Sequence, residues 1–323
     1  MFNVVKKRAM SVLQGQRFQP VFQQLLDAKY KPVLLDELDK TAKPEDIKVI
    51  LVAQHPRYER LVQLMRELPN LKAVVNFGVG VNHIDVDVAK QIGIKVSNTP
   101  DCLSAGTADL AFAILLAAAR NVVIGDSIAK HPSTEKFDMH WLGTEVNGSV
   151  IGIVGMGRIG FEIAKRARGF DMEVVYHNRH RRPKEEEEKV QASFCSSLVE
   201  LLSQSDFVVA VVPATEETKR MFKIEQFAAM KKTAIFVNIC RGTVVDHDAL
   251  TKALEMQQIA GAALDVTDPE PLPRDHPLLA MKNVVITPHI GSATIGTRKK
   301  MLQMCMDNIE AALNDKQLPN EVV

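Results

Sequence analysis

Three short segments late in the sequence carry side chains that could transfer a proton and bind an anion. Arg241 follows an apolar run, Glu270 stands between two prolines, and His289 comes just before a glycine–serine pair. A histidine and a carboxylate can form a general acid–base pair, and an arginine can bind carboxylate oxygens through two hydrogen bonds. Each residue alone has an ordinary explanation, as a loop arginine, a turn carboxylate or a buried histidine. Their order at the ends of successive expected strands favours one catalytic set.

A glycine-rich turn upstream could hold phosphates. The apolar run Val150–Val154 leads directly into Gly155, Met156, Gly157, Arg158, Ile159 and Gly160. In such a turn the first glycine allows the tight bend, the second leaves room for a pyrophosphate, and the third lets the helix pack on the strand. The helix expected at 158–169 would offer free backbone N–H groups, including those of Arg158 and Ile159, to the phosphates. A tight strand-to-helix turn without a ligand is the alternative, but the strand and helix context predicts a dinucleotide site.

The residues after the next expected strand indicate which dinucleotide. An NAD site normally has an Asp or Glu there, whose carboxylate binds the ribose hydroxyls. This sequence has Asn178, Arg179, His180, Arg181 and Arg182 instead, with no carboxylate to repel a 2′-phosphate. Arginine binds phosphate oxygens well. A merely basic surface loop is the alternative; we expect NADP(H) in preference to NAD(H).

The elements that must position these residues alternate between apolar strand-like runs and helical stretches, as in parallel sheets covered by helices. Strands are expected at 32–35, Val49–Val52, 73–77 and Lys95–Ser97, and, in a second series, at Val150–Val154, 173–176, 207–212, 234–238, 261–265 and 284–287. Helices are expected at Tyr58–Glu67 and 294–313, and the acidic run 185–188 is interpreted as a solvated turn or helix start. Two such series predict an α/β protein with two Rossmann-like lobes.

Composition excludes several classes of function. The 323 residues include 46% hydrophobic and 24% charged residues, and the net charge of +1 gives no general field for nucleic acid or an anionic membrane. The four cysteines are far apart, so neither a metal site nor a disulfide framework is expected. The longest apolar run, 110–119, is too short to cross a bilayer and is interpreted as a buried helix.

The cellular compartment is expected to be the cytoplasm, because the cysteine usage fits a reducing environment. Residues 1–26 contain no acidic residue and several basic ones, which weakly resembles a mitochondrial transit peptide. The alternative interpretation is an opening strand at 2–5 followed by a helix with a basic face.

Taken together, these motifs resemble the D-2-hydroxyacid dehydrogenase family, most closely its glyoxylate reductase/hydroxypyruvate reductase branch. The resemblance runs from about Asn76 to the C-terminus, and its most specific parts are Arg241-Gly242 with Val244-Val245, the segment 265–273, and the segment 289–294. It implies hydride transfer from NADPH to a small 2-keto acid, giving the D-2-hydroxy acid. His289 would be the general acid, with Glu270 holding its ring and Arg241 binding the substrate's oxygens.

The resemblance also implies an organisation of the chain. Residues 1–99 and 290–323 would form a flavodoxin-like substrate-binding domain, and 100–289 an NADP-binding Rossmann domain with a dimerisation arm at 121–147. A homodimer is expected, and Trp141 of the arm would either reach a partner's active site or be an ordinary interface or core aromatic.

Further site residues follow from the resemblance alone. Val79 and Gly80 would bind the substrate carboxylate through backbone N–H groups, Thr107 would lie near the nicotinamide, and Asp265 would bind the carboxamide side. The remaining expected contacts are Pro213, Thr218, Ile239 and Gly291 for the cofactor and Ser292 for the substrate.

The sequence departs from the family pattern at Asn82-His83, at Asp109, where Glu is usual, and at Cys240, where Ser is usual. These departures put the fit of the substrate in doubt more than the acid–base pair. Two alternatives stay open: a nucleotide-sensing, corepressor-like binding protein of the same fold, and another member of the family such as a phosphoglycerate dehydrogenase.

Overall fold

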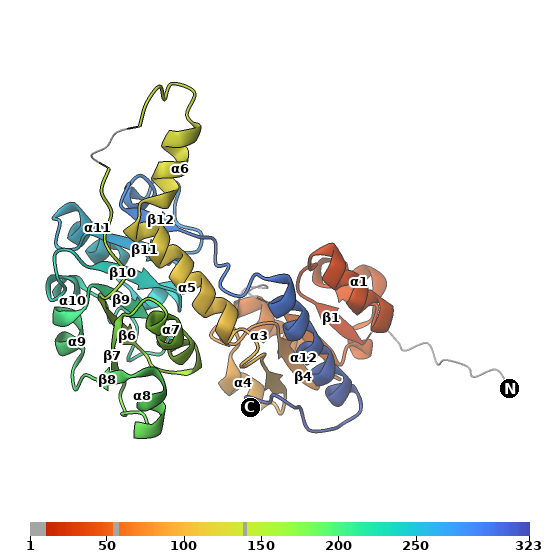
Figure 1. Cartoon of the computed structure of the whole chain (residues 1–323). Helices are drawn as coiled ribbons and strands as arrows, with labels where there is room; N and C mark the ends of the chain where they lie inside the picture. The colour runs from red at the N-terminus through yellow and green to blue at the C-terminus, as the bar shows by residue number, and fades with distance from the viewer. Residues whose placement is uncertain (1–10, 54–57, 138–140) are drawn as a thin grey trace. The chain divides into compact units, whose positions relative to one another are not determined.

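A computed structural model describes residues 11–53, 58–137 and 141–323 (Figure 1). The chain divides into two compact units, which are Met1–Leu103 with Thr294–Val323 and Ser104–Ala293. The division falls where helix α5 (Ser104–Ala119) begins and where Thr294 caps helix α12 (Ile295–Leu313). The expected boundaries were 99/100 and 289/290, at the preceding strand and turn. The opening strand expected at 2–5 lies outside the described residues.

The first unit is built on a sheet of five parallel strands in the order β2-β1-β3-β4-β5, which is the flavodoxin order. The strands are β1 (Val12–Gln14), β2 (Val33–Leu34), β3 (Val49–Val52), β4 (Ala73–Asn76) and β5 (Lys95–Ser97). The helices are α1 (Pro20–Lys29), α2 (Leu38–Thr41), α3 (Tyr58–Glu67), α4 (Val86–Gln91) and α12, with 3₁₀ turns at Leu35–Glu37 and Pro44–Asp46. Helix α12 packs on β3, β4 and α1, so the last helix completes the core begun by the N-terminal strands.

The second unit has seven parallel strands in the order β12-β11-β10-β9-β6-β7-β8. They are β6 (Val150–Val154), β7 (Glu173–His177), β8 (Ala192–Phe194), β9 (Phe207–Ala210), β10 (Ile235–Asn238), β11 (Gly261–Leu264) and β12 (Val284–Ile286). The chain changes direction across the sheet between β6 and β9, and ligands of open α/β sheets bind at such a switch point. The short strand β8 was not foreseen, because only three residues pair with its neighbour β7.

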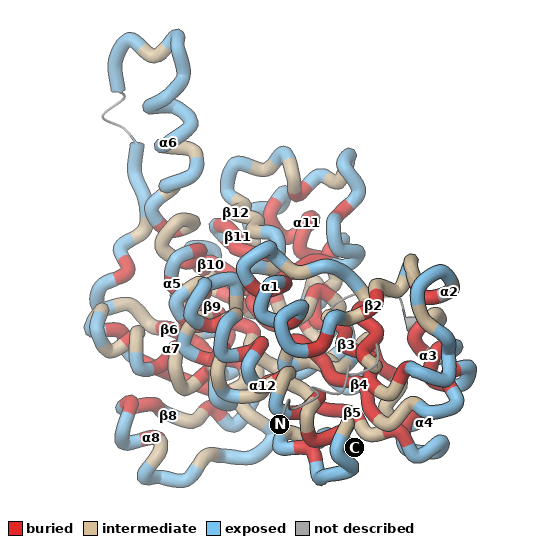
Figure 2. The backbone as a smooth tube through the Cα atoms, turned by 90° about the vertical axis from the view of Figure 1, so that its right-hand side faces the viewer, coloured by how far each residue is buried: buried red, intermediate tan, exposed pale blue. Residues whose placement is uncertain are grey.

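The second unit also contains helices, most of which cover the sheet and bury its apolar side chains. They are α5, α6 (Val122–Lys130), α7 (Arg158–Arg168), α8 (Lys184–Val190), α9 (Leu198–Gln204), α10 (Ile224–Ala228) and α11 (His247–Glu255), with 3₁₀ turns at Gly242–Val244 and Pro277–Leu279. Helix α5 packs on α7, β10 and β11, which agrees with the buried helix expected from its apolar run. Helix α6 has no buried residue, and Figure 2 shows it exposed, in contrast to the buried strands.

No single helix in the described part of the chain is long and apolar enough to cross a membrane, although α5 and α6 pass that test together across a bend of 63°.

The structure corrects the expectation for the acidic run 185–188. It belongs to helix α8, but Glu187 is buried instead of solvated, because its carboxylate accepts hydrogen bonds from Tyr176 and Arg181.

Candidate active site

The candidate catalytic residues lie at one edge of the second sheet. Arg241 follows β10 and His289 follows β12, while Glu270 lies in the loop after β11, between them. The three strands are adjacent and parallel, with Asn238 paired to Leu264 and Leu264 paired to Ile286. Their carboxyl ends therefore meet at the same edge, which is where open α/β sheets place their ligands.

His289 and Glu270 form the expected pair. The ring atom Nδ1 of His289 lies 3.0 Å from Oε1 and 3.3 Å from Oε2 of Glu270. An ionised carboxylate can only accept, so Nδ1 carries the shared hydrogen. Both side chains are partly exposed, at 24% for His289 and 37% for Glu270, so a small molecule can reach them.

A buried aspartate fixes the turn that carries the histidine. Asp265 is 2% exposed; its Oδ1 accepts hydrogen bonds from the Thr287 hydroxyl (2.7 Å) and the Ile290 N–H (2.8 Å). Its Oδ2 accepts from the Gly291 N–H at 2.9 Å, and its carbonyl accepts from the His289 N–H at 2.9 Å. Burial raises the pKa of Asp265, and these hydrogen bonds act in the opposite direction. Asp265 was expected only to bind the cofactor, and its hydrogen bonds to the His289 turn were not predicted.

Asn238 fixes the turn that carries Arg241, as Asp265 fixes the turn that carries His289. The fully buried Asn238 side chain donates to the Arg241 carbonyl at 3.0 Å and accepts from the Cys240 N–H at 3.1 Å. The Cys240 thiol also donates to Asn238 Oδ1, and burial raises the pKa of Cys240 to about 11. The unusual cysteine is therefore a neutral thiol behind Arg241. The sequence signal that could have identified this role is an Asn at the end of an apolar strand.

Gly242 brings the arginine turn against the loop that carries Glu270. A Cβ placed on Gly242 would lie 2.0 Å from the carbonyl carbon and oxygen of Thr267 and 2.5 Å from the N of Asp268. Only glycine permits this approach of two backbones. The spacing between Arg241 and Glu270 thus depends on the absence of a Cβ at Gly242.

The glycine turn after β6 has the shape that a dinucleotide needs. Gly155 has φ +107°, and a Cβ there would lie 2.6 Å from the Val211 carbonyl oxygen. A Cβ on Gly160 would lie 2.3 Å from the Gly155 oxygen, whereas one on Gly157 would meet no atom within 4 Å. Gly157 caps α7 without a side-chain hydrogen bond, and the N-terminal end of a helix suits the binding of phosphates. These residues fit a nicotinamide dinucleotide.

The basic segment after β7 is partly committed to internal contacts. Arg181 makes two 2.8 Å hydrogen bonds to the Glu187 carboxylate, and Arg182 pairs with Glu186. Asn178 accepts a 2.6 Å hydrogen bond from the Met156 N–H and so holds the glycine turn. Arg179 is exposed and makes no ion pair within the described residues, which leaves it available to a phosphate group.

Most of the other expected cofactor contacts lie at the same edge. A Cβ on Gly291 would be 3.3 Å from both the Thr107 methyl group and Asp265 Oδ2, so these three residues are neighbours. The Thr218 hydroxyl donates to the Pro213 carbonyl at 2.6 Å, in the segment after β9. Ile239 directly follows β10 and is buried, and Ser292 is half-buried after the His289 turn. Trp141 is exposed, at 45%.

In the first unit, the segment after β4 offers free backbone donors. The Asn76 side chain donates to the carbonyls of Gly78 and Gly80 at 3.0 Å each, and the Asn98 side chain donates to that of Val79 at 2.8 Å. The carbonyls are thereby satisfied, but the N–H groups of Val79 and Gly80 have no acceptor within the parts of the chain that are described. We call residues 76–80 the amide loop; such paired N–H groups suit an anion.

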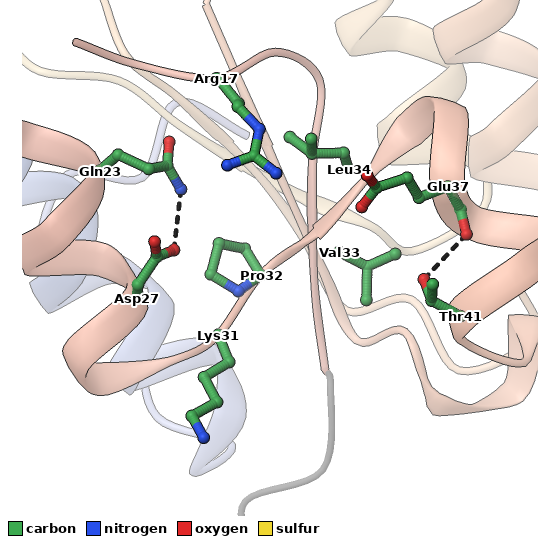
Figure 3. A pocket seen from close by; sticks show the side chains of 9 residues that line it. All are labelled: Arg17, Gln23, Asp27, Lys31, Pro32, Val33, Leu34, Glu37 and Thr41. Atoms are coloured by element: carbon green, nitrogen blue, oxygen red, sulfur yellow. Dashed lines mark hydrogen bonds between the residues drawn. The ribbon is translucent and has the colours of Figure 1, made fainter. Parts of the chain in front are cut away.

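A pocket of about 250 Å³ also lies in the first unit, between α1, β2 and α2 (Figure 3). Its charged lining consists of Arg17, Lys31, Asp27 and Glu37. Two positive and two negative side chains give it no preference for an anion. It also lacks the acid–base pair, so it is not the candidate active site. The described residues contain no cluster of three or more His, Cys, Asp or Glu side chains that could hold a metal ion.

Known proteins are similar to this chain in both sequence and fold. Residues 112–291 match the family described as D-isomer specific 2-hydroxyacid dehydrogenase, NAD binding domain. A glyoxylate reductase from Pyrococcus horikoshii is 47% identical over 254 residues, which cover 77% of this chain and 75% of that protein. The Thermus thermophilus protein TT0316 has a TM-score of 0.86 at 38% identity, covering 97% of this chain and 99% of that one. An NADPH-dependent glyoxylate/hydroxypyruvate reductase from Sinorhizobium meliloti, solved with NADP and malonate, has a TM-score of 0.85 at 30% identity over 97% of this chain and 96% of that one.

Proposed function

The chain belongs to the D-isomer specific 2-hydroxyacid dehydrogenase family, and from this premise we propose that it is an NADPH-dependent reductase of glyoxylate and hydroxypyruvate. Membership makes it an oxidoreductase that uses a nicotinamide dinucleotide. The single observation that carries the proposal is the hydrogen-bonded pair of His289 and Glu270 at the strand ends beside Arg241. Relatives named as glyoxylate reductases support the substrate.

In the proposed reaction, the bound reduced cofactor supplies a hydride for the carbonyl carbon of the keto acid. His289 donates the proton from Nε2 to the carbonyl oxygen, a role that typically contributes a factor of about 10² to 10⁴ to the rate. Glu270 at Nδ1 keeps the ring oriented and stabilises its charged form. Arg241 binds the carbonyl and carboxylate oxygens and offsets the negative charge that develops there. The product carries one more hydride and one more proton, in the D configuration.

The amide loop is proposed to bind the substrate carboxylate. The free N–H groups of Val79 and Gly80 support this assignment, since they have no acceptor within the described chain. A carboxylate accepting hydrogen bonds from two backbone N–H groups is held in one orientation, which sets the carbonyl for reaction.

The direct test is NADPH oxidation with glyoxylate and with hydroxypyruvate, followed by absorbance. His289→Ala should lower kcat by about 10² to 10⁴ while the Kd for NADPH stays the same, because the glycine turn belongs to another strand. Full activity in this variant would refute the acid role. A protein that binds NADPH but reduces no 2-keto acid would instead support the corepressor-like alternative.

The preference for NADPH is proposed to depend on Arg179. Arg179→Met should weaken NADPH about tenfold or more and leave NADH nearly unchanged, since a charge-assisted hydrogen bond contributes roughly 1.5–3 kcal/mol. Arg181→Met is the matched control: it removes the same charge two residues away, but from a side chain already bonded to Glu187. Equal losses for both cofactors in Arg179→Met would contradict the assignment.

The arm after α5 is proposed to pair with a second copy of the chain. Large apolar side chains on α6 and the segment after it are exposed: Val122, Val123, Ile128, Phe137, Trp141 and Leu142. Such a group on a single extension is typical of an interaction surface, which supports the homodimer expected from the sequence.

A further inference from the structure

Arg298 on α12 has an unusual electrostatic environment. Its guanidinium lies 5.3 Å from the centre of the Phe77 ring, in a cation–π contact. Within the described chain no carboxylate lies within ion-pair distance of it, although its side chain is only partly exposed. Burial lowers the pKa of Arg298, and no neighbouring charge opposes that effect. A desolvated cation without an anionic partner is costly unless a ligand supplies the charge.

The position of Arg298 on its helix adds to this cost. Thr294 caps α12, so Arg298 is the fourth residue of the helix, at the end of its first turn. The N-terminal end of a helix carries a partial positive charge and favours anions. The next two residues, Lys299 and Lys300, are also cationic but are exposed to water. Arg298 is therefore the cation of this group that gains most from a nearby anion.

The ring under Arg298 belongs to the amide loop. Phe77 is 7% exposed and contacts both Arg298 and Phe18, whose ring centre is 4.6 Å from its own. The carbonyls on both sides of the free N–H groups are held by Asn76 and Asn98. The contacts of Phe77 with Phe18 and Arg298 therefore support the same loop whose N–H groups lack acceptors within the described chain.

We propose that Arg298 is a positioning residue for the carboxylate of the 2-keto acid, holding the amide loop through Phe77 and favouring an anion at its N–H groups. This inference rests on the proposed function. It assigns to α12 a part in substrate affinity that is separate from the acid–base pair. Arg298 should act mainly on KM, because it supports the binding of the carboxylate and does not touch the carbonyl.

Three variants of the full-length protein test the proposal. Arg298→Met keeps an unbranched apolar stem over Phe77 and removes the charge, and should raise KM for glyoxylate about tenfold, equivalent to about 1.4 kcal/mol, with kcat within about threefold. Arg298→Lys restores the charge without the planar stack and should recover part of the affinity. Lys299→Met removes the neighbouring exposed charge and should change neither constant.

A binding measurement separates this inference from the proposed function. Oxamate, a carboxylate that cannot be reduced, is titrated calorimetrically into the NADPH-loaded protein, and Arg298→Met should raise its Kd about as much as KM. An unchanged KM and oxamate Kd in Arg298→Met would overturn the inference. The inference would also be overturned if Arg298→Met lowered both kcat and the melting temperature and Arg298→Lys restored neither, since this would indicate a merely structural role. If the wild type reduces no keto acid, the proposed function fails, and the oxamate Kd of wild type against Arg298→Met still decides the role of Arg298.

Discussion

Replacing Gly242 with alanine is expected to disable catalysis without preventing folding. The added Cβ would lie 2.0 Å from the backbone of Thr267, where ordinary contacts begin near 3.4 Å. The arginine turn and the Glu270 loop must therefore separate by about an ångström, because both contacts are backbone atoms that cannot rotate away. A misplacement of about 1 Å in a catalytic set can cost about 100-fold in rate. We expect kcat to fall about 100-fold, with a loss of stability of about 1–3 kcal/mol typical of overpacking.

Gly261→Ala is the matched control. Its Cβ would also meet backbone, at 2.8 Å from the Asn283 carbonyl oxygen, but at the amino end of β11, where the strand begins. It should lower the stability while leaving kcat nearly unchanged. Steady-state kinetics with glyoxylate and urea unfolding of both variants make the comparison. A folded Gly242→Ala protein with wild-type kcat would refute the argument that this backbone contact sets the catalytic spacing, as would an equal loss of kcat in Gly261→Ala.

Three further predictions concern other parts of the chain. Glu270→Gln should lower kcat about 100-fold with little change in NADPH affinity, because an amide orients His289 but does not stabilise its charged form; a mild effect on kcat would show that the charge of Glu270 is unimportant. Hydrogen bonds from Arg181 are the first cause of the lowered pKa of Glu187, so their stabilisation is present above the ordinary glutamate pKa of about 4.3 and is lost as the pH falls below it. Glu187→Gln should therefore lower the melting temperature at neutral pH and make little difference below about pH 3, and a gap independent of pH would contradict this. Phe137→Glu should convert a dimer to monomers in analytical ultracentrifugation, whereas an unchanged mass would remove Phe137 from the interface.

The sequence predicted most of the strands because they are largely apolar runs that end in polar or glycine-containing turns. Val49–Val52, Lys95–Ser97 and Val150–Val154 agree residue for residue with the structure. The strand β8 was missed, since its three residues follow a charged helix and are too few to form an apolar run of strand length. Short edge strands depend on pairing with their neighbours, which a local pattern does not contain.

The pairing of His289 with Glu270 was also predicted, whereas the residues that hold the Arg241 and His289 turns in place were not. Motif and resemblance identify residues that would touch a ligand, but Asn238 and Asp265 act through hydrogen bonds to backbone N–H and C=O groups of the turns beside them. The commitment of Arg181 to Glu187 has the same origin. Arg179 and Arg181 are equivalent in the sequence, and only the position of helix α8 distinguishes them.

The sheet explains why the orienting acid comes from the segment between the arginine and the histidine. Neighbouring strands lie about 4.8 Å apart, so the ends of β10 and β12 are separated by roughly 10 Å, with β11 between them. The acid must pair with the His289 ring, and its loop must also contact the Arg241 turn. The loop after the middle strand, β11, is the nearest to both. The loop after β11 does both: Glu270 bonds to His289, and Thr267 meets Gly242. Because one loop controls both distances, a change at Gly242 should disturb Glu270 as well as Arg241, and its effect on kcat should be less than additive with that of Glu270→Gln.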